Sequence, residues 1–276
     1  LLGYPAASQH ALDAVASRDV PLRLLAAAAS LAIVISRLAA DLQLWSTAEF
    51  GFVAFPDRLV GGSSAMPQKR NAFLLEHLRA KPGQSLGGWA AAASMMAATP
   101  FTNSIEVGTE AMAAIWPGLS AAEDAVSLSQ VVVSGARPDP ARMSERAMDG
   151  FTMATSLANR LVQQGMSFRT AHHLMGEAVR KAVEAGSTDL AAFGQPGWLD
   201  EIGLPGLDLA ELVRAHAYGG GPGAFGPVFQ RVAAAWTAHR DWHQRWRESL
   251  RMADATLAEA VARVCDQAGP QPAVPA

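Results

Sequence analysis

The chain has 276 residues, of which half are hydrophobic and 17% are charged, and its formal net charge is −3. Acids and bases are mixed along the chain without a basic tract or an acidic tail, so we expect no nucleic-acid partner. The single cysteine, Cys265, excludes an internal disulfide framework and fits a reducing cytoplasm. Ala and Leu dominate, and Val, Ile and Thr form no alternating runs, which predicts an all-α fold of packed helices.

The first long helix is predicted from Asp13 or Asp19 to about Trp45. Its apolar run raises the question of a membrane span. Polar and charged side chains interrupt this run, which favours the buried helix of a soluble protein and no membrane partner. The interrupting residues are Arg23, Ser36, Arg37, Asp41 and Gln43.

Two further long helices are predicted before the middle of the chain. The first of these runs from after Pro67 to about Met96, with a kink or a break at Pro82 because proline removes a backbone hydrogen bond. The other runs over about 106–134 and should bend near Pro117. Loops rich in Gly and Pro separate the helices.

Gly135 and Pro138 mark the predicted domain boundary. It separates a central helical-bundle domain at residues 1–137 from a small C-terminal helical domain at residues 138–276. Shorter helices are expected near 150–164, 167–185 and 207–216, and the tail at 269–276 is expected to be disordered.

A long helix should close the chain. Its apolar and aromatic residues alternate four and three positions apart, which lays one stripe suited to packing against another helix. The stripe consists of Phe225, Phe229, Val232, Trp236, His239, His243, Trp246 and Leu250. His239 and His243 have the i, i+4 spacing of a metal pair, but no acidic or Cys ligand stands at a suitable spacing beside them. We therefore expect no metal site.

The segment 61–71, Gly-Gly-Ser-Ser-Ala-Met-Pro-Gln-Lys-Arg-Asn, carries the clearest chemical signal. Backbone N–H groups of a Gly-rich loop that enters a helix form an anion site. Lys69 adds a positive charge and Asn71 an amide donor, so the segment suits a carboxylate or a phosphate. It lacks the Gly-Lys-Ser/Thr of a Walker loop. The alternative is an ordinary capped turn, with Ser63 or Ser64 as the helix N-cap.

This segment closely resembles the signature of the fumarase, aspartase and argininosuccinate lyase superfamily, Gly-Ser-Ser-x-x-Pro-x-Lys-x-Asn. Every fixed position is matched, by Gly62, Ser63, Ser64, Pro67, Lys69 and Asn71. Flanking segments resemble the argininosuccinate lyase branch, and the resemblance covers nearly the whole chain. These segments are Leu12-Asp13-Ala14-Val15, Arg18-Asp19, Glu49-Phe50-Gly51-Phe52-Val53, Pro56-Asp57 and Tyr218-Gly219-Gly220. The resemblance implies a long-helix bundle of the fumarase/aspartase type.

The resemblance also implies a carbon–nitrogen lyase without a cofactor. Such enzymes remove a proton next to a carboxylate and release an amine, leaving fumarate, and a cation with oriented donors stabilises the charge that develops. By resemblance Ser63 is the general base, and Ser64 shares this task or caps the helix. The substrate-binding residues would be Ser64, Lys69 and Asn71, and possible site-lining residues are Met66, Gln68 and Asn103. Arg70 is expected to be a solvated or subunit-contact side chain.

Members of this family are homotetramers whose active sites combine segments from three subunits. The family motifs that supply an active-site histidine and a succinyl-binding segment stand earlier in the chain, and neither is visible here. Residue 1 is Leu. We therefore expect that this chain starts within a longer protein and that the segment alone is inactive.

The residues after Pro100 bear on the small-molecule substrate. Argininosuccinate lyases usually carry a Tyr, a Gln and a Lys there, which contact the arginine side of the substrate, and this chain has Asn103, Gly108 and Ala111 at those places. Losing these contacts should weaken binding of that half. We predict an N-substituted aspartate with another amine, as in the related ethylenediamine-disuccinate lyases. The alternatives are true argininosuccinate cleavage, adenylosuccinate cleavage, or a non-catalytic structural protein like the lens crystallins of this family.

Overall fold

The computed structural model describes residues 6, 8–190, 193, 216 and 221–267. The regular elements of the described part are helices apart from one two-stranded ladder, so the all-α prediction is confirmed. Its contacts divide it into two compact units, one that ends at Gly150 and one that begins at Phe151.

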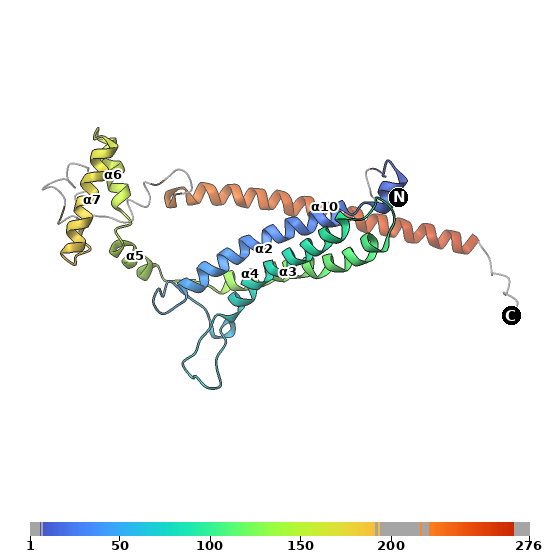
Figure 1. Ribbon diagram of the computed structural model, residues 1–276, viewed down its shortest axis with the longest axis horizontal. Coiled ribbons are helices and arrows are strands. Elements are labelled where there is room, and N and C mark those ends of the chain that lie inside the picture. The colour runs from blue at the N-terminus through green and yellow to red at the C-terminus, as the bar shows by residue number, and fades with distance from the viewer. Residues whose placement is uncertain (1–5, 7, 191–192, 194–215, 217–220, 268–276) are drawn as a thin grey trace. The chain divides into compact units, whose positions relative to one another are not determined.

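The first unit is built on three long antiparallel helices, α2 (Asp19–Trp45), α3 (Phe73–Ala97) and α4 (Ala111–Gly135), which lie side by side (Figure 1). A short helix α1 (Ala11–Ala16) precedes them, and the π-helical turn η2 (Glu106–Glu110) leads into α4. Two buried apolar clusters join the three helices. One contains Leu75, Leu78, Ala125 and Val132, and the other contains Leu25, Ala92, Ala111 and Ile115.

Helix α2 is the most apolar of the three. By length and composition it could cross a membrane, with a mean hydropathy of 1.8, and the core helix of a soluble protein passes the same test. Here it packs against α3 and α4 through small and apolar side chains, which favours the interpretation as a bundle helix. The buried residues are Leu25, Ala29, Ala32, Ala39 and Leu42.

Helix α3 lies within its predicted range. It starts at Phe73, because residues 60–72 form a loop, and it continues through Pro82 without a break. A proline inside a helix costs about 3 kcal/mol, and contacts with α4 on both sides of it oppose this cost. Lys81 Nζ lies 2.6 Å from Asp124 Oδ2, and the buried Ser85 hydroxyl donates to the Gly118 carbonyl at 2.8 Å.

The first unit extends beyond residue 137, the predicted end of the first domain. Strand β1 (Val53–Ala54) pairs antiparallel with β2 (Arg137–Pro138), which ties the segment after α4 to the loop after α2. Helix α5 (Pro140–Asp149) follows, with the Asp139 carboxylate as its N-cap. Arg142 Nε in this helix donates to the Phe50 carbonyl at 3.4 Å. Long-range backbone pairing therefore holds residues 137–149 in the first unit.

The second unit contains α6 (Ala154–Gln163) and α7 (Phe168–Glu184), which pack as a helical hairpin through buried Leu157, Leu161 and Met175. A 3-10 turn, η4 (Pro222–Ala224), begins the long helix α10 (Phe225–Gln267). The helices near 150–164 and 167–185 and the closing helix are confirmed. The helix predicted at 207–216 and the tail at 269–276 lie outside the described residues.

Helix α10 exposes most of its apolar stripe, and Ala253 is its one buried residue. Trp236 is 61% exposed and Trp246 is 51% exposed. The His243 ring lies 6.3 Å from the Trp246 ring. Over the described ranges, no group of three or more His, Cys, Asp or Glu side chains could hold a metal ion.

Two neighbouring glycines of α3 offer a matched pair of substitutions. An added Cβ at Gly88 would lie 2.7 Å from the Ala114 carbonyl oxygen, a backbone atom of α4, whereas one at Gly87 would meet nothing within 4 Å. We expect Gly88→Ala to lower the free energy of unfolding by about 1–3 kcal/mol through overpacking. Gly87→Ala should raise it by about 0.5–1 kcal/mol through helix propensity. Denaturant unfolding of both variants measures these changes, and effects of the same sign would contradict the close approach of α3 and α4.

Candidate active site

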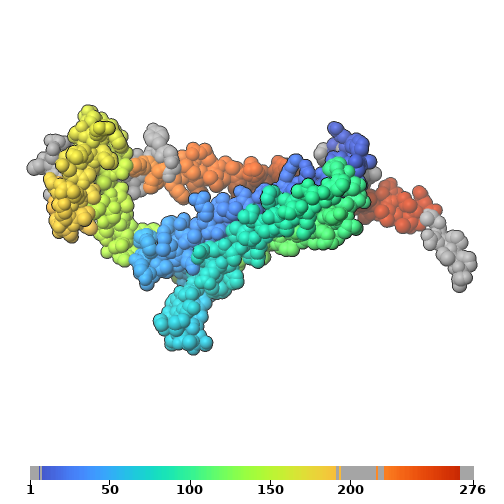
Figure 2. All heavy atoms as spheres, viewed as in Figure 1, coloured from blue at the N-terminus to red at the C-terminus, as the bar shows by residue number. Residues whose placement is uncertain are grey.

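The signature segment lies in the loop between α2 and α3, which projects beyond the helices in Figures 1 and 2. The loop leaves the bundle where α2 and α4 end and α3 begins, and we call this the serine end of the bundle. Phe55 and Leu59 of the loop are buried in the larger apolar cluster, and Leu59 ends the single turn η1 (Asp57–Leu59) that precedes the signature. The loop therefore has an anchored base and an exposed tip.

A backbone bridge closes the signature into a ring. Gly61 N–H donates to the Asn71 carbonyl at 2.7 Å, and Asn71 N–H donates to the Gly61 carbonyl at 3.0 Å. Arg70 Nη2 also lies 2.5 Å from Asp57 Oδ1, which ties this stem to η1. The nine residues between the bridge partners are thus held at their base, while Gly62 to Gln68 reach outwards.

Ser63 organises the tip of the loop. Its Oγ accepts hydrogen bonds from Ala65 N–H and Met66 N–H, both at 3.2 Å, and the Met66 carbonyl accepts from Lys69 N–H at 3.0 Å. Donors aimed at an oxygen stabilise negative charge on it. The alternative in which a signature serine caps α3 is wrong, because the N-cap of α3 is Ala72.

Six of the seven predicted site residues share this loop. Ser63 and Lys69 are half-buried, and the other four are exposed, namely Ser64, Met66, Gln68 and Asn71. Asn103 lies apart from them, because it follows α3 whereas the signature precedes it. Helix α3 has 25 residues, a length of about 37 Å at the usual rise per residue. One copy of the chain therefore does not bring Asn103 to Ser63.

The opposite end of the bundle holds the positions that differ from the usual amine-side residues. Asn103 precedes η2, Gly108 lies within it, and Ala111 is buried at the start of α4. A hydrogen bond from its own backbone N–H keeps the pKa of the exposed Glu106 below its usual value. A cavity of about 140 Å³ lies at this end, and it is lined by Arg18, Asp19, Phe101 and Val107 among others.

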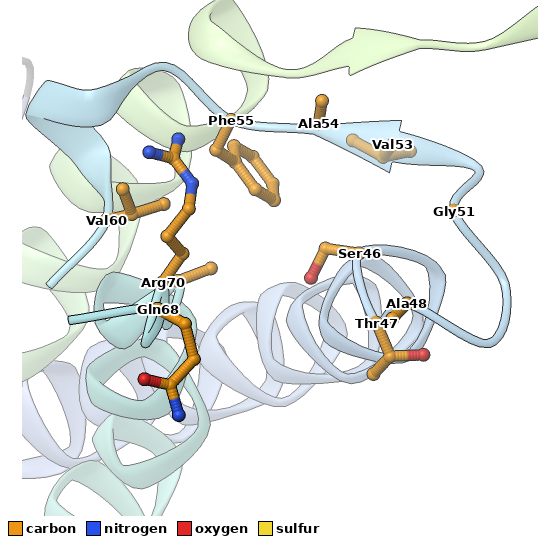
Figure 3. A pocket seen from close by; sticks show the side chains of 11 residues that line it. Ser46, Thr47, Ala48, Gly51, Val53, Ala54, Phe55, Val60, Gln68 and Arg70 are labelled. Carbon is orange, nitrogen blue, oxygen red and sulfur yellow. The ribbon is translucent and has the colours of Figure 1, made fainter. Parts of the chain in front are cut away.

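A larger cavity of about 440 Å³ lies against the stem of the serine loop (Figure 3). Gln68, Arg70 and Ala72 line it at alternate positions, while Lys69 and Asn71 are not among its lining residues. The position of Arg70 beside this cavity was not predicted from the sequence. Alternation of side chains in an extended segment is the signal that could have placed Gln68 and Arg70 together.

Two protein families match separate parts of this chain. A lyase family model matches residues 1–87, and an argininosuccinate lyase C-terminal model matches residues 151–194. The argininosuccinate lyase of Thermus thermophilus is 39% identical over 185 residues, which are 67% of this chain and 40% of that protein. The argininosuccinate lyase of Pelotomaculum thermopropionicum is 32% identical over 241 residues, which are 85% of this chain and 52% of that protein.

Among solved structures, an EDDS lyase in complex with formate matches with a TM-score of 0.83 and 25% identity, over 95% of this chain and 55% of that chain. The chain thus spans about half the length of the relatives it matches. The sequence matches and the shared fold both extend well beyond the signature loop, and they show that this chain belongs to the argininosuccinate lyase branch of the fumarase/aspartase superfamily.

Proposed function

We propose that the protein is a fumarate-releasing carbon–nitrogen lyase that eliminates an amine from an N-substituted aspartate. The observation that carries this proposal is the serine loop. All fixed positions of the superfamily signature are present, and the loop is closed at its stem with Ser63 Oγ bound by two backbone N–H groups. Relatives at 39% and 32% identity are argininosuccinate lyases, which supports the reaction class.

In the proposed reaction, Ser63 accepts the proton from the carbon next to one substrate carboxylate. The electron pair of the C–H bond forms the C=C bond of fumarate as the C–N bond breaks, and the amine leaves with the pair of that bond. The N–H donors from Ala65 and Met66 favour the deprotonated serine oxygen that can act as base. Lys69 and Asn71 would hold the carboxylate, whose negative charge grows during proton removal.

We further propose that the complete site forms in a homotetramer in the cytoplasm. Asn103 and Ser63 stand at opposite ends of α3, so both can line one site only if different copies supply them. Many apolar side chains on α2 and α4 are exposed, which is unusual for a monomer, and they offer a surface for contact with other copies. They include Val20, Leu24, Leu31, Val34, Trp116 and Val133.

The amine is proposed to differ from arginine. Asn103, Gly108 and Ala111 provide neither an aromatic ring nor an ammonium group, and Ala111 is fully buried. The ionised Glu106 in the same segment favours an amine that carries a further positive charge, such as a diamine. True argininosuccinate cleavage is the second candidate, because the sequence relatives named above are argininosuccinate lyases. The intact signature argues against a purely structural role.

The role of Ser63 can be tested by substitution. We expect Ser63→Ala to lower kcat by about 100-fold or more, the usual contribution of a general base. The comparison variant is Ser64→Ala, which should lower kcat less than Ser63→Ala does and act mainly through KM, because Ser64 is expected to bind substrate. Circular dichroism and the oligomeric state should not change in either variant. A Ser63→Ala enzyme with wild-type kcat, or a larger loss in Ser64→Ala, would assign the proton transfer to another residue.

The amine can be identified by running the reaction in the direction of addition. The enzyme is mixed with fumarate and one amine at a time, and loss of fumarate absorbance reports the product. We expect faster addition with a diamine or an amino acid other than arginine, because the arginine-side contacts are replaced. If arginine were the one amine that adds to fumarate, true argininosuccinate cleavage would be established instead.

A further inference from the structure

The cavity against the stem of the serine loop is built entirely within the first unit. Its volume is about 440 Å³, within the range of small-molecule sites. Three parts of the chain form it: the end of α2, the segment around β1, and both sides of the loop stem. The lining residues are Ser46, Thr47, Ala48, Gly51, Val53, Ala54, Phe55, Val60, Gln68, Arg70 and Ala72.

Arg70 gives the cavity its charge, since it alone is charged among these lining residues. Figure 3 shows its guanidinium on the side of Phe55, across the cavity from Ser46 and Thr47. Its contact with Asp57 is solvent-exposed, with the two side chains 57% and 86% accessible. Such pairs contribute little, about 0–1 kcal/mol. A guanidinium has five N–H donors, so donors remain for a second anion.

The other polar groups complement Arg70. The Ser46 hydroxyl donates to the Gln43 carbonyl and the Thr47 hydroxyl donates to the Leu44 carbonyl, both at 2.9 Å. In this structure both hydroxyl hydrogens are directed at backbone carbonyls, which leaves fewer donors for a bound anion. Donors to an anion are therefore concentrated at Arg70 and the Gln68 amide, and Phe55, Val53 and Val60 supply apolar walls.

We propose that this cavity binds a small aliphatic carboxylate through Arg70 and that its occupant stabilises the serine loop. Bidentate pairing with a guanidinium is the geometry that a carboxylate prefers. The occupant would contact both sides of the stem. On one side it would touch Val60, which precedes Gly61, and on the other it would touch Arg70 and Ala72, which flank Asn71. Binding therefore favours the closed stem from which Ser63 and Lys69 project. An effect of the bound carboxylate on catalysis rests on the proposed lyase function, whereas binding of the carboxylate does not.

This site differs from the proposed substrate site in two respects. Lys69 and Asn71, which would hold the substrate carboxylate, do not line the cavity. The cavity is also complete in one copy of the chain, whereas the substrate site needs residues from both ends of the bundle. A chain that lacks turnover should therefore still bind the carboxylate.

The test uses succinate as the probe and isothermal titration calorimetry of the chain and its variants. Arg70→Gln should weaken binding about tenfold or more, because the charged bidentate contact is lost. Asp57→Asn breaks the same ion pair but removes the competing carboxylate, so it should strengthen binding. Lys69→Gln should leave this binding unchanged. Arg70→Lys keeps the charge without the planar fork and should fall between wild type and Arg70→Gln.

Hydrogen exchange supplies the second readout. Succinate should slow exchange of the Gly61 and Asn71 amides, which form the bridge, in wild type and in Lys69→Gln but not in Arg70→Gln. Absence of binding, or binding lost in Lys69→Gln and kept in Arg70→Gln, would overturn the proposal. Neither result bears on the lyase function, which the Ser63 variants test separately. If the Ser63 variants showed that Ser63 is not the base, the calorimetric result would still stand.

Discussion

The pair of backbone hydrogen bonds between Gly61 and Asn71 is the constraint on which the candidate site depends. Ordering a flexible loop costs conformational entropy, and two glycines within the signature raise that cost. The bridge fixes the ends of the loop, so that only its tip remains to be ordered. Ser63 Oγ then orders the tip through two further N–H groups. Lys69 and Arg70 are neighbours in this stem, but Arg70 lines the cavity and Lys69 does not.

The stem is fixed only because the bundle beneath it is tightly packed. Gly88 allows α3 to approach the Ala114 carbonyl of α4, and Gly135 leaves room for the Leu59 side chain from the loop. Gly135 lets the loop base sit against the end of α4, whereas Gly88 sets the approach of α3 to α4 nearer the opposite end of the bundle. The β1–β2 pairing adds a backbone connection from the end of α4 to the same loop. Position and rigidity of the serine loop are therefore properties of helix packing at the serine end.

Much of this fold could be predicted from the sequence, because long helices leave a strong local signal. The apolar pattern placed α2 within a few residues and predicted a long closing helix, and the Gly and Pro clusters placed the loops. Pro82, however, does not break α3. A proline changes only the local cost of a helix, whereas contacts such as Ser85 with Gly118 decide the outcome. The cavity could not be predicted, since three separated segments meet in it and only packing brings them together.

The candidate site, too, could be predicted from the sequence only in part. The signature identifies Ser63, Lys69 and Asn71 without a structure, and their catalytic roles stay predictions. What the sequence does not convey is distance along the bundle. Helix α3 separates Asn103 from the serine loop by its full length, so a substrate that contacts both must lie between two copies. Each copy would then hold a complete carboxylate cavity but only part of a substrate site. Under this arrangement assembly controls whether elimination is possible, and occupancy of the cavity tunes each serine loop independently of its neighbours.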